Sequence, residues 1–148
     1  MPAIPGLRSP YDKAAGGLHH LGRMIDKIRL QHAGALPPEM QRNYGLAVGL
    51  DGRLCGFLGM TFTAVEARVR EGGTDAELAE WVFAHGLRPN RMQAIAWNEY
   101  SRKLGWNDRL TPFLQKQLRE EGLDPAQVVT ALDAIEVTEG RPPAAARS

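Results

Sequence analysis

The side chains best suited to chemistry lie along one predicted helix, between Leu18 and Ala33. His19, Arg23 and Asp26 follow one another there at helical spacing. At about 100° per residue they share a sector of roughly 60°, nearly opposite the apolar stripe of the same helix. Lys27 lies at the border of that sector. An imidazole, a guanidinium and a carboxylate are therefore expected within reach of one another.

Such a set of side chains could bind an anion and move a proton. The fork of N–H donors on Arg23 would hold the anionic group. His19 would accept or donate the proton, and Asp26 would fix the tautomer of the imidazole. The alternative is a solvated helix face, on which the same charges form ion pairs that contribute little to stability. We take His19 and Asp26 as candidate catalytic residues, and Arg23 and Lys27 as candidate ligand-binding residues.

Charge is unevenly distributed along the chain, although the formal net charge is only +1. Residues 1–50 hold six Lys and Arg against three acidic residues, and the remainder holds twelve against fourteen. A basic lobe beside an acidic body favours a small anionic ligand. Arg8 and Lys13 are expected to join Arg23 in binding it, and backbone amides of a helix starting after Pro10 would add donors.

A second pair of candidates comes from the aromatic residues. Trp81 and His85 are four residues apart on a predicted helix, so His85 could act as a base beside an aromatic wall. The alternative is a half-buried histidine at a helix C-terminus, where the helix dipole favours its cation. Both residues are kept as candidate ligand-binding residues. Trp97, Tyr100 and Trp106 are more typical of the interior of a helical domain.

Other kinds of site find no support in the sequence. Cys55 lies among apolar residues with no neighbouring base, so we expect a small buried side chain rather than a nucleophile. His19 and His20 are adjacent and point about 100° apart on a helix, a poor arrangement for one metal ion. No Gly-Lys-Ser/Thr phosphate loop and no calcium loop is present. We therefore expect no metal and no cofactor, and non-redox acid–base chemistry if a reaction is catalysed.

The 148 residues are enough for one domain and too few for two. Apolar residues follow a helical period almost throughout, and 16 Gly and 10 Pro separate the segments. The prediction is an all-α, single compact domain of five to seven short helices without significant sheet. It spans residues 1–140. Residues 141–148 hold a double proline and little to bury, so a disordered C-terminal tail is expected there.

Helix starts are indicated by hydroxyl, amide or carboxyl side chains, several of them followed by Pro or by an acidic residue. The segment 46–59 is less regular. Asp51-Gly52 is typical of a hairpin turn, but no alternating strand flanks it, so a loop followed by a helix from Arg53 to Leu58 is preferred, with Gly59 as its end. The predicted starts are Ser9-Pro10, Glu39, Thr63, Thr74, Asn90, Thr111-Pro112 and Asp124-Pro125.

Three short motifs are spread over the chain. They are Leu7-Arg8-Ser9-Pro10, Gly22-Arg23-Met24-Ile25-Asp26-Lys27 and Glu139-Gly140-Arg141. With them the chain resembles a family of small bacterial proteins classified as a domain of unknown function, in which an Arg-Ser-Pro opening, an Arg-x-x-Asp-Lys helix and an acidic-Gly-Arg ending recur. The likeness runs from Leu7 to Arg141, although Val137-Thr138 stand where the family pattern implies more acidic residues. The resemblance implies no reaction, substrate or cofactor.

Two hypotheses from different classes remain open. The first, which we favour, is a binding site for a small anionic molecule, with or without acid–base catalysis. The second is a protein–protein interaction module or homodimer without catalytic activity, which would show an exposed apolar patch and no deep pocket.

Other partners and compartments are not expected. The basic residues are few and are not interleaved with aromatics, so we expect no nucleic-acid partner. Apolar runs are shorter than a membrane span, so we expect no membrane partner. The single cysteine leaves no intrachain disulfide, and the prediction is a soluble, cytoplasmic protein.

Overall fold

The computed structural model describes residues 3–144, and within them it contains helices and no strand. The all-α prediction is confirmed. The described residues form seven α-helices and one 3₁₀ helix, η1. The total of eight helices is one more than the upper limit of the predicted five to seven. In chain order they are α1 (Leu21–His32), η1 (Pro38–Asn43), α2 (Leu50–Leu58), α3 (Phe62–Arg70), α4 (Asp75–His85), α5 (Arg91–Lys103), α6 (Thr111–Glu120) and α7 (Ala131–Thr138). No helix in this part of the chain is both long enough and apolar enough to cross a membrane.

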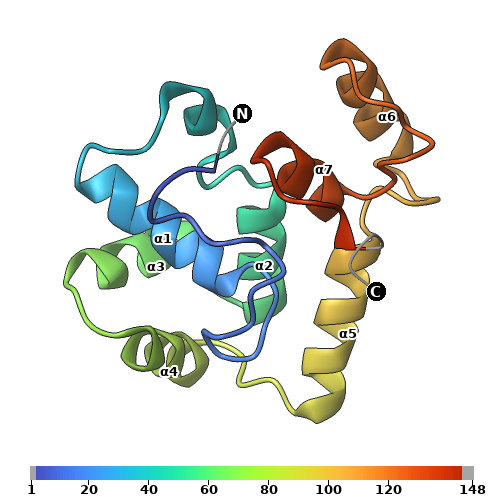
Figure 1. Ribbon diagram of the computed structural model, residues 1–148. Helices are drawn as coiled ribbons and strands as arrows, with labels where there is room; N and C mark the ends of the chain where they lie inside the picture. Colours follow the sequence, from blue (N-terminus) through green and yellow to red (C-terminus); the bar gives the residue numbers. More distant parts are fainter. Residues whose placement is uncertain (1–2, 145–148) are drawn as a thin grey trace.

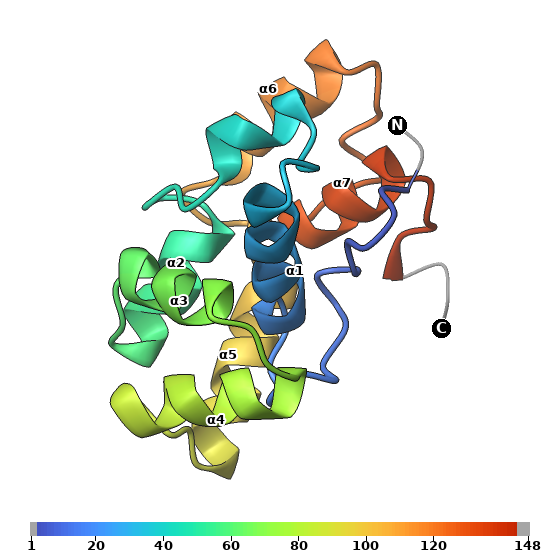
Figure 2. The same cartoon turned by 90° about the vertical axis from the view of Figure 1, so that its left-hand side faces the viewer.

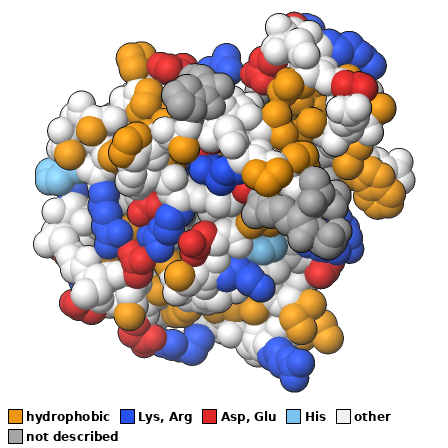
Figure 3. All heavy atoms as spheres, viewed as in Figure 1, with side chains coloured by type: hydrophobic (Ala, Val, Ile, Leu, Met, Phe, Trp, Pro, Cys, Tyr) orange, Lys and Arg blue, Asp and Glu red, His pale blue; other side chains and the backbone are white. Residues whose placement is uncertain are grey.

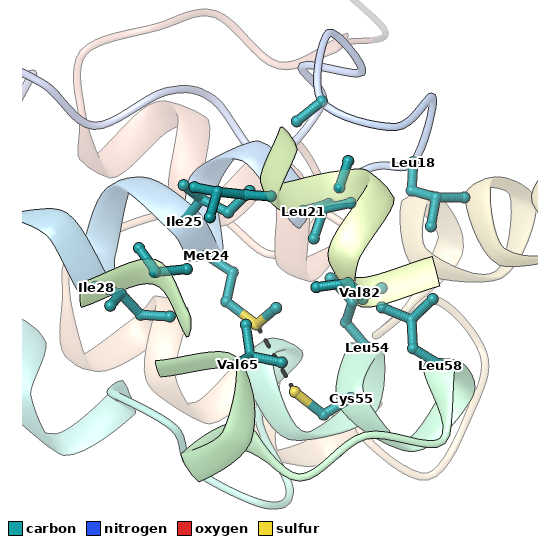
Figure 4. Close-up of a cluster of buried hydrophobic side chains, with 14 of the residues drawn as sticks. Leu18, Leu21, Met24, Ile25, Ile28, Leu54, Cys55, Leu58, Val65 and Val82 are labelled. Carbon is teal, nitrogen blue, oxygen red and sulfur yellow. Dashed lines mark hydrogen bonds between the residues drawn. The ribbon is translucent and has the colours of Figure 1, made fainter. Parts of the chain in front are cut away.

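Helix α1 lies in the middle of the molecule, with the other helices around it (Figures 1 and 2). Its apolar side chains recur every three or four residues and so form one face, which packs against α3 and α4. Cys55 lies in this core with its Sγ 3.9 Å from the Sδ of Met24, and burial raises the pKa of the thiol to about 11. The core also contains Leu18, Leu21, Ile25, Ile28, Leu54, Leu58, Val65 and Val82 (Figure 4).

A second, smaller apolar cluster joins α6 to α7 and to the segment between them. It contains Leu114, Leu118, Val128 and Ala134. Helix α6 projects from the upper end of the molecule in Figure 1, on the opposite side from η1. The upper part of the molecule is therefore held together separately from the core around α1.

Several predicted helix ends agree with the structure. Thr74 and Asn90 each accept a hydrogen bond from the backbone three residues on and form the capping boxes of α4 and α5. In the segment 46–59, the preferred loop followed by a helix is present, and α2 ends before Gly59, whose φ of +68° suits a glycine. The predicted start at Arg53 was wrong, because α2 begins three residues earlier, at Leu50. The turn predicted at Glu39 is η1.

Three further predicted helix starts were wrong. Residues 10–17 form turns, since Ser9 Oγ and Asp12 Oδ1 accept hydrogen bonds from backbone amides two residues on and so compete with a helix. The cap of α3 is Thr61 and not Thr63. After Asp124-Pro125 the chain makes only a turn, and α7 begins at Ala131 with Thr130 as its cap.

The sequence predicts Trp97, Tyr100 and Trp106 in the interior, and the structure confirms this only for Trp97. Trp97 is 3% exposed, and its Nε1–H donates to the carbonyl of His19 at 2.9 Å. Tyr100 and Trp106 are exposed. Tyr100 lies on the outer side of α5, where its hydroxyl accepts from Arg53, and Trp106 follows the turn at Gly105.

Residues 141–144, which the sequence prediction places in the tail, bond to α7. The side chain of Arg141 donates to Glu136 at 2.8 Å and to Glu139 at 2.7 Å. The amide of Ala144 donates to the carboxylate of Asp133 at 2.9 Å. The remainder of the predicted tail, residues 145–148, lies outside the described residues.

Candidate functional site

The first and second sequence motifs meet at the N-terminal segment. Asp26 accepts three hydrogen bonds from Arg8: from its backbone amide at 2.9 Å, from Nε at 2.8 Å and from Nη2 at 3.0 Å. Arg8 also pairs with Asp75 of α4 at 2.7 Å, as does Arg29 of α1 at 2.9 Å. These bonds tie the N-terminal segment and α4 to α1, and Figure 3 shows acidic and basic side chains intermixed on the face of the molecule over α1.

The second and third motifs meet through a buried ion pair between α1 and the end of α7. Both Nη atoms of Arg23 donate to the carboxylate of Glu139, one of them at 2.9 Å, and each side chain is 3% exposed. Arg141 donates to the same carboxylate. Burial alone would raise the pKa of Glu139, but the hydrogen bond from Arg23 holds that pKa below its usual value. The motif residues are thus first of all partners of one another.

A second buried group lies next to this pair. The carboxylate of Asp51 bonds to His20 Nε2 and to Lys27 Nζ, both at 2.7 Å, and accepts from the amide of Gly45 at 2.9 Å. Burial lowers the pKa of His20 and that of Lys27. It would raise the pKa of Asp51, but the hydrogen bond from His20 and the charge of Lys27 hold that pKa well below its usual value. The imidazole is therefore neutral near pH 7 and donates its Nε2–H to the carboxylate.

His20 carries two local costs. Its φ of +72° lies in the left-handed region, which is unusual for a residue with a Cβ and costs on the order of 1–3 kcal/mol. Its Nδ1 is buried without a hydrogen-bond partner, which costs about 1–3 kcal/mol more. Such costs persist where the surrounding structure enforces them, and they concentrate at functional sites.

A cavity of about 410 Å³ opens beside these two groups, within the range of roughly 300–1,000 Å³ typical of small-molecule sites. His20, Arg23 and Lys27 line its buried side. Helices α6 and α7 supply most of the apolar wall, and η1 and the start of α2 supply polar groups. The remaining lining residues are Glu39, Met40, Arg42, Asn43, Val48, Gly49, Leu50, Arg53, Leu104, Leu110, Leu114, Gln117, Glu121, Ala131, Ala134, Ile135, Thr138 and Glu139.

Within residues 3–144, unpaired charged groups of both signs belong to the lining: the guanidinium of Arg42 and the carboxylate of the exposed Glu39. Arg42 has no hydrogen-bond or ion-pair partner in residues 3–144. Arg53 donates to the carbonyl of Val48 and to the hydroxyl of Tyr100, both neutral groups. The carboxylate of Glu139 is already shared by two arginines. Two further carboxylates, Glu39 and Glu121, are exposed.

The structure brings two of the predicted site residues, Arg23 and Lys27, into the cavity lining. Arg8 and Asp26 are not part of that lining and are engaged with each other. His19 lies elsewhere, with its Nδ1 3.3 Å from the Oγ of Ser101 and its ring edge-on to Tyr11. No hydrogen bond joins His19 to Asp26 in the described residues, so the predicted proton-transfer pair is not assembled there.

The other three predicted residues are also outside the cavity lining. Lys13 is exposed. Burial of His19 lowers the pKa of its imidazole, and the charge of Lys13 lowers that pKa further. The rings of Trp81 and His85 stack with centroids 4.2 Å apart, and His85 Nδ1 lies 2.8 Å from the carbonyl of Trp81. Both belong to α4, at the opposite end of the molecule from α6 (Figure 1).

Sequence reasoning missed His20, Asp51, Arg42 and Arg53 as site residues. His20 could have been found, because it precedes Arg23 by three residues and Lys27 by seven and so shares their helical face. Asp51 carried no such signal, since it reaches Lys27 across 24 residues of chain from a different helix. In the described residues no group of three or more His, Cys, Asp or Glu is arranged to hold a metal ion.

The cavity, the two buried groups and all three motifs fall inside one family match. The model of the family described as "Domain of unknown function (DUF5069)" matches residues 4–141. The chain belongs to DUF5069. No curated protein matches it. The resemblance inferred from the motifs is therefore confirmed as membership of a domain family of unknown function.

Replacing Glu139 by Gln in this DUF5069 protein removes the negative charge between Arg23 and Arg141 and keeps the side-chain shape. We expect the free energy of unfolding to fall by about 3–5 kcal/mol, because the Arg23 guanidinium is left buried without its counter-charge. Urea denaturation measures the change. The control is Glu80→Gln, which breaks an exposed pair with Arg88 and is expected to leave the midpoint unchanged. Similar effects of the two substitutions would contradict the assignment.

Stability is expected to fall as the pH is lowered from about 7 to 5. Burial lowers the pKa of His19 and that of His20 in the folded protein, whereas the unfolded chain takes up these protons near pH 6.5. The unfolded state then binds more protons than the folded state, so acid favours unfolding. Urea denaturation at stepped pH measures the slope, and His19→Gln should reduce it. A flat profile in the unmodified protein would show that the imidazoles are not held neutral.

Proposed function

We propose that this DUF5069 protein binds a small anionic molecule in the cavity between α1, η1, α6 and α7. The observation that carries the proposal is the cationic side of the lining. Arg23 and Lys27 are 3% and 4% exposed and line an open cavity. Both cations are already paired, Arg23 with Glu139 and Lys27 with Asp51, so the proposal rests on the donors that these pairs leave free.

The pairing of these two cations leaves room for a further anion. The Nε–H of Arg23 makes no hydrogen bond in the described residues, and Lys27 Nζ uses two of its three donors, on Asp51 and the carbonyl of Asn43. Arg42 adds a guanidinium without a counter-charge. Free donors in a low-dielectric site favour an acceptor that carries negative charge.

The opposite wall supports a ligand with an apolar part. Leu104 and Leu114 are buried, and Leu110 and Ile135 are half-buried around the same cavity. A pocket that is mostly apolar and has a few convergent polar groups is the usual form of a small-molecule site. A small carboxylate or phosphate with a short carbon skeleton fits this arrangement.

The test is a thermal titration of the protein with sodium phosphate, acetate, propionate and citrate at constant ionic strength. A ligand at 100 times its Kd stabilises the folded state by about 2.7 kcal/mol, which raises the melting temperature by roughly 5–10 °C in a domain of this size. Arg42→Ala should reduce the rise and leave the ligand-free melting temperature unchanged, since Arg42 is exposed and unpaired.

The matched control is Arg91→Ala, another exposed arginine, which does not line the cavity. It should leave the rise intact. A melting temperature that no acid raises, or an equal loss in the two arginine variants, would reject the cavity as an anion site.

A second candidate function, self-association, is favoured by an exposed apolar surface beside α6. Trp106, Phe113 and Val129 are 56%, 72% and 42% exposed. Figure 3 shows hydrophobic side chains gathered on the face over α6. Trp106 and Val129 also border a hollow of about 250 Å³. Patches of this kind mark interaction sites when they are continuous.

Self-association would appear in light scattering as a molar mass that rises with concentration and falls back in Trp106→Ala. The control is Met92→Ala on α5, which removes an exposed apolar side chain elsewhere. A constant monomer mass would reject this second candidate.

A further inference from the structure

Arg53 of α2 carries a guanidinium that is held in place without a counter-charge. Its Nε donates to the carbonyl of Val48 at 2.9 Å, and its Nη1 donates to the hydroxyl of Tyr100 at 2.8 Å. No carboxylate pairs with it in residues 3–144. The side chain is half-buried and lines the cavity. Charges taken out of water are normally paired, so this cation is oriented for an anion that the protein itself does not supply.

Two donors of the cavity lining are both unpaired and accessible. Nη2 of Arg53 and Nε of Arg23 make no hydrogen bond in the described residues. The one fully enclosed side-chain nitrogen or oxygen without a partner in that part of the chain is Nδ1 of His20. Neither arginine nitrogen is enclosed in this way, and both arginines line the cavity. A molecule in the cavity can therefore reach a cationic donor on each of them.

The two arginines are positioned by different parts of the fold. Arg23 lies on α1 and is paired with Glu139 after the end of α7, whereas Arg53 lies on α2 and is bonded to Tyr100 of α5. Apolar side chains of α6 and α7 line the same cavity. A carbon chain with an acid group at each end suits this lining, because its ends meet the guanidinium groups and its methylene groups meet apolar side chains.

We infer that the ligand of the cavity carries two anionic groups joined by a short carbon chain, one bound at Arg23 and the other at Arg53. This inference rests on the proposed function and adds the substrate class to it. Tyr100 is a positioning residue for the second group, because its hydroxyl holds the guanidinium of Arg53 and the residue itself does not line the cavity.

The other unpaired charges of the lining have a smaller effect. Arg42, Glu39 and Glu121 are exposed, so water and salt screen them. Among the unpaired charged groups of the described lining, Arg53 is the one that is not exposed. A fixed and partly desolvated cation attracts an anion more strongly than exposed carboxylates repel it. The lining therefore favours a second anionic group at Arg53 over a cationic group at the glutamates.

The experiment compares acids that share a carbon skeleton and differ by one charge. Titration calorimetry on the full chain, near neutral pH and at constant ionic strength, pairs malonate, succinate and glutarate each with its monomethyl ester. A further titration with 3-phosphonopropionate separates phosphonate from carboxylate recognition. The dianion of at least one pair should bind about tenfold tighter than its ester, because only the dianion makes a charged hydrogen bond at each arginine.

Tyr100→Phe tests the positioning of Arg53 without changing any charge, so the general attraction between the protein and a dianion stays the same. Phenylalanine keeps the ring that packs on Trp97 but removes the hydroxyl that accepts from Arg53. The preference for the dianion should fall by about three- to tenfold. The affinity for the monomethyl ester, whose single acid group binds at the more buried Arg23, should not change. A merely structural role of Tyr100 would lower both affinities together.

Arg53→Gln removes the second cation and should abolish the preference for the dianion. The matched control is Arg91→Gln, which removes an exposed arginine outside the lining and should keep the preference. Should Arg53→Gln fail to fold, the acid pairs and Tyr100→Phe still decide the matter.

The possible failures are distinguishable. Equal affinities within every pair would overturn the inference and leave anion binding in place, because one acid group would then satisfy the site. A preference that survives both Tyr100→Phe and Arg53→Gln would also overturn it, since the second group would bind elsewhere. If none of these acids binds, the proposed function and this inference fail together.

Discussion

The buried ion pair between Arg23 and Glu139 is the interaction on which the upper half of the molecule depends. It joins the central helix to the last one, where the second apolar cluster is small. A buried ion pair is weak evidence for stability, because the cost of taking both charges out of water offsets their attraction. Its stronger effect is on geometry. Both Nη atoms of Arg23 donate to the one carboxylate of Glu139, and this bidentate pair fixes the orientation of α7 relative to α1. That placement forms one side of the cavity.

The motifs of the DUF5069 domain follow from this requirement. Arg8 pairs with Asp26, and Arg23 and Arg141 share Glu139. Cations that a helical domain places in its interior need carboxylates from distant parts of the chain, and each motif supplies one half of such a pair. The structure therefore gives the motifs an architectural role, and the candidate ligand site consists of the donors that remain free after these pairs have formed.

The helical class and most helix ends could be predicted from sequence, because capping boxes and apolar periodicity are local signals that the structure retains. The start of α7 could not, since Asp124 and Pro125 make a turn whose side-chain bonds imitate a helix start. At the site, helical spacing correctly grouped Arg23 with Lys27. It also grouped His19 with Asp26, which was wrong, because the predicted helix from Leu18 begins only at Leu21. The left-handed backbone of His20 takes His19 off the helical face. Asp51, which orients His20, comes from another helix, so the periodicity of α1 cannot predict it.

The separate apolar cluster under α6 has a thermodynamic consequence for the cavity wall. Each large apolar side chain that is fully buried contributes about 1.5–3 kcal/mol, and the cluster holds only Leu114, Leu118, Val128 and Ala134. Detaching α6 therefore costs less free energy than dissolving the core around α1, so this wall belongs to a subglobal unit of lower stability. The charged side of the cavity thus belongs to a unit with a higher free energy of unfolding than the apolar side. Substitutions in the apolar wall can therefore loosen α6 without unfolding the core around α1.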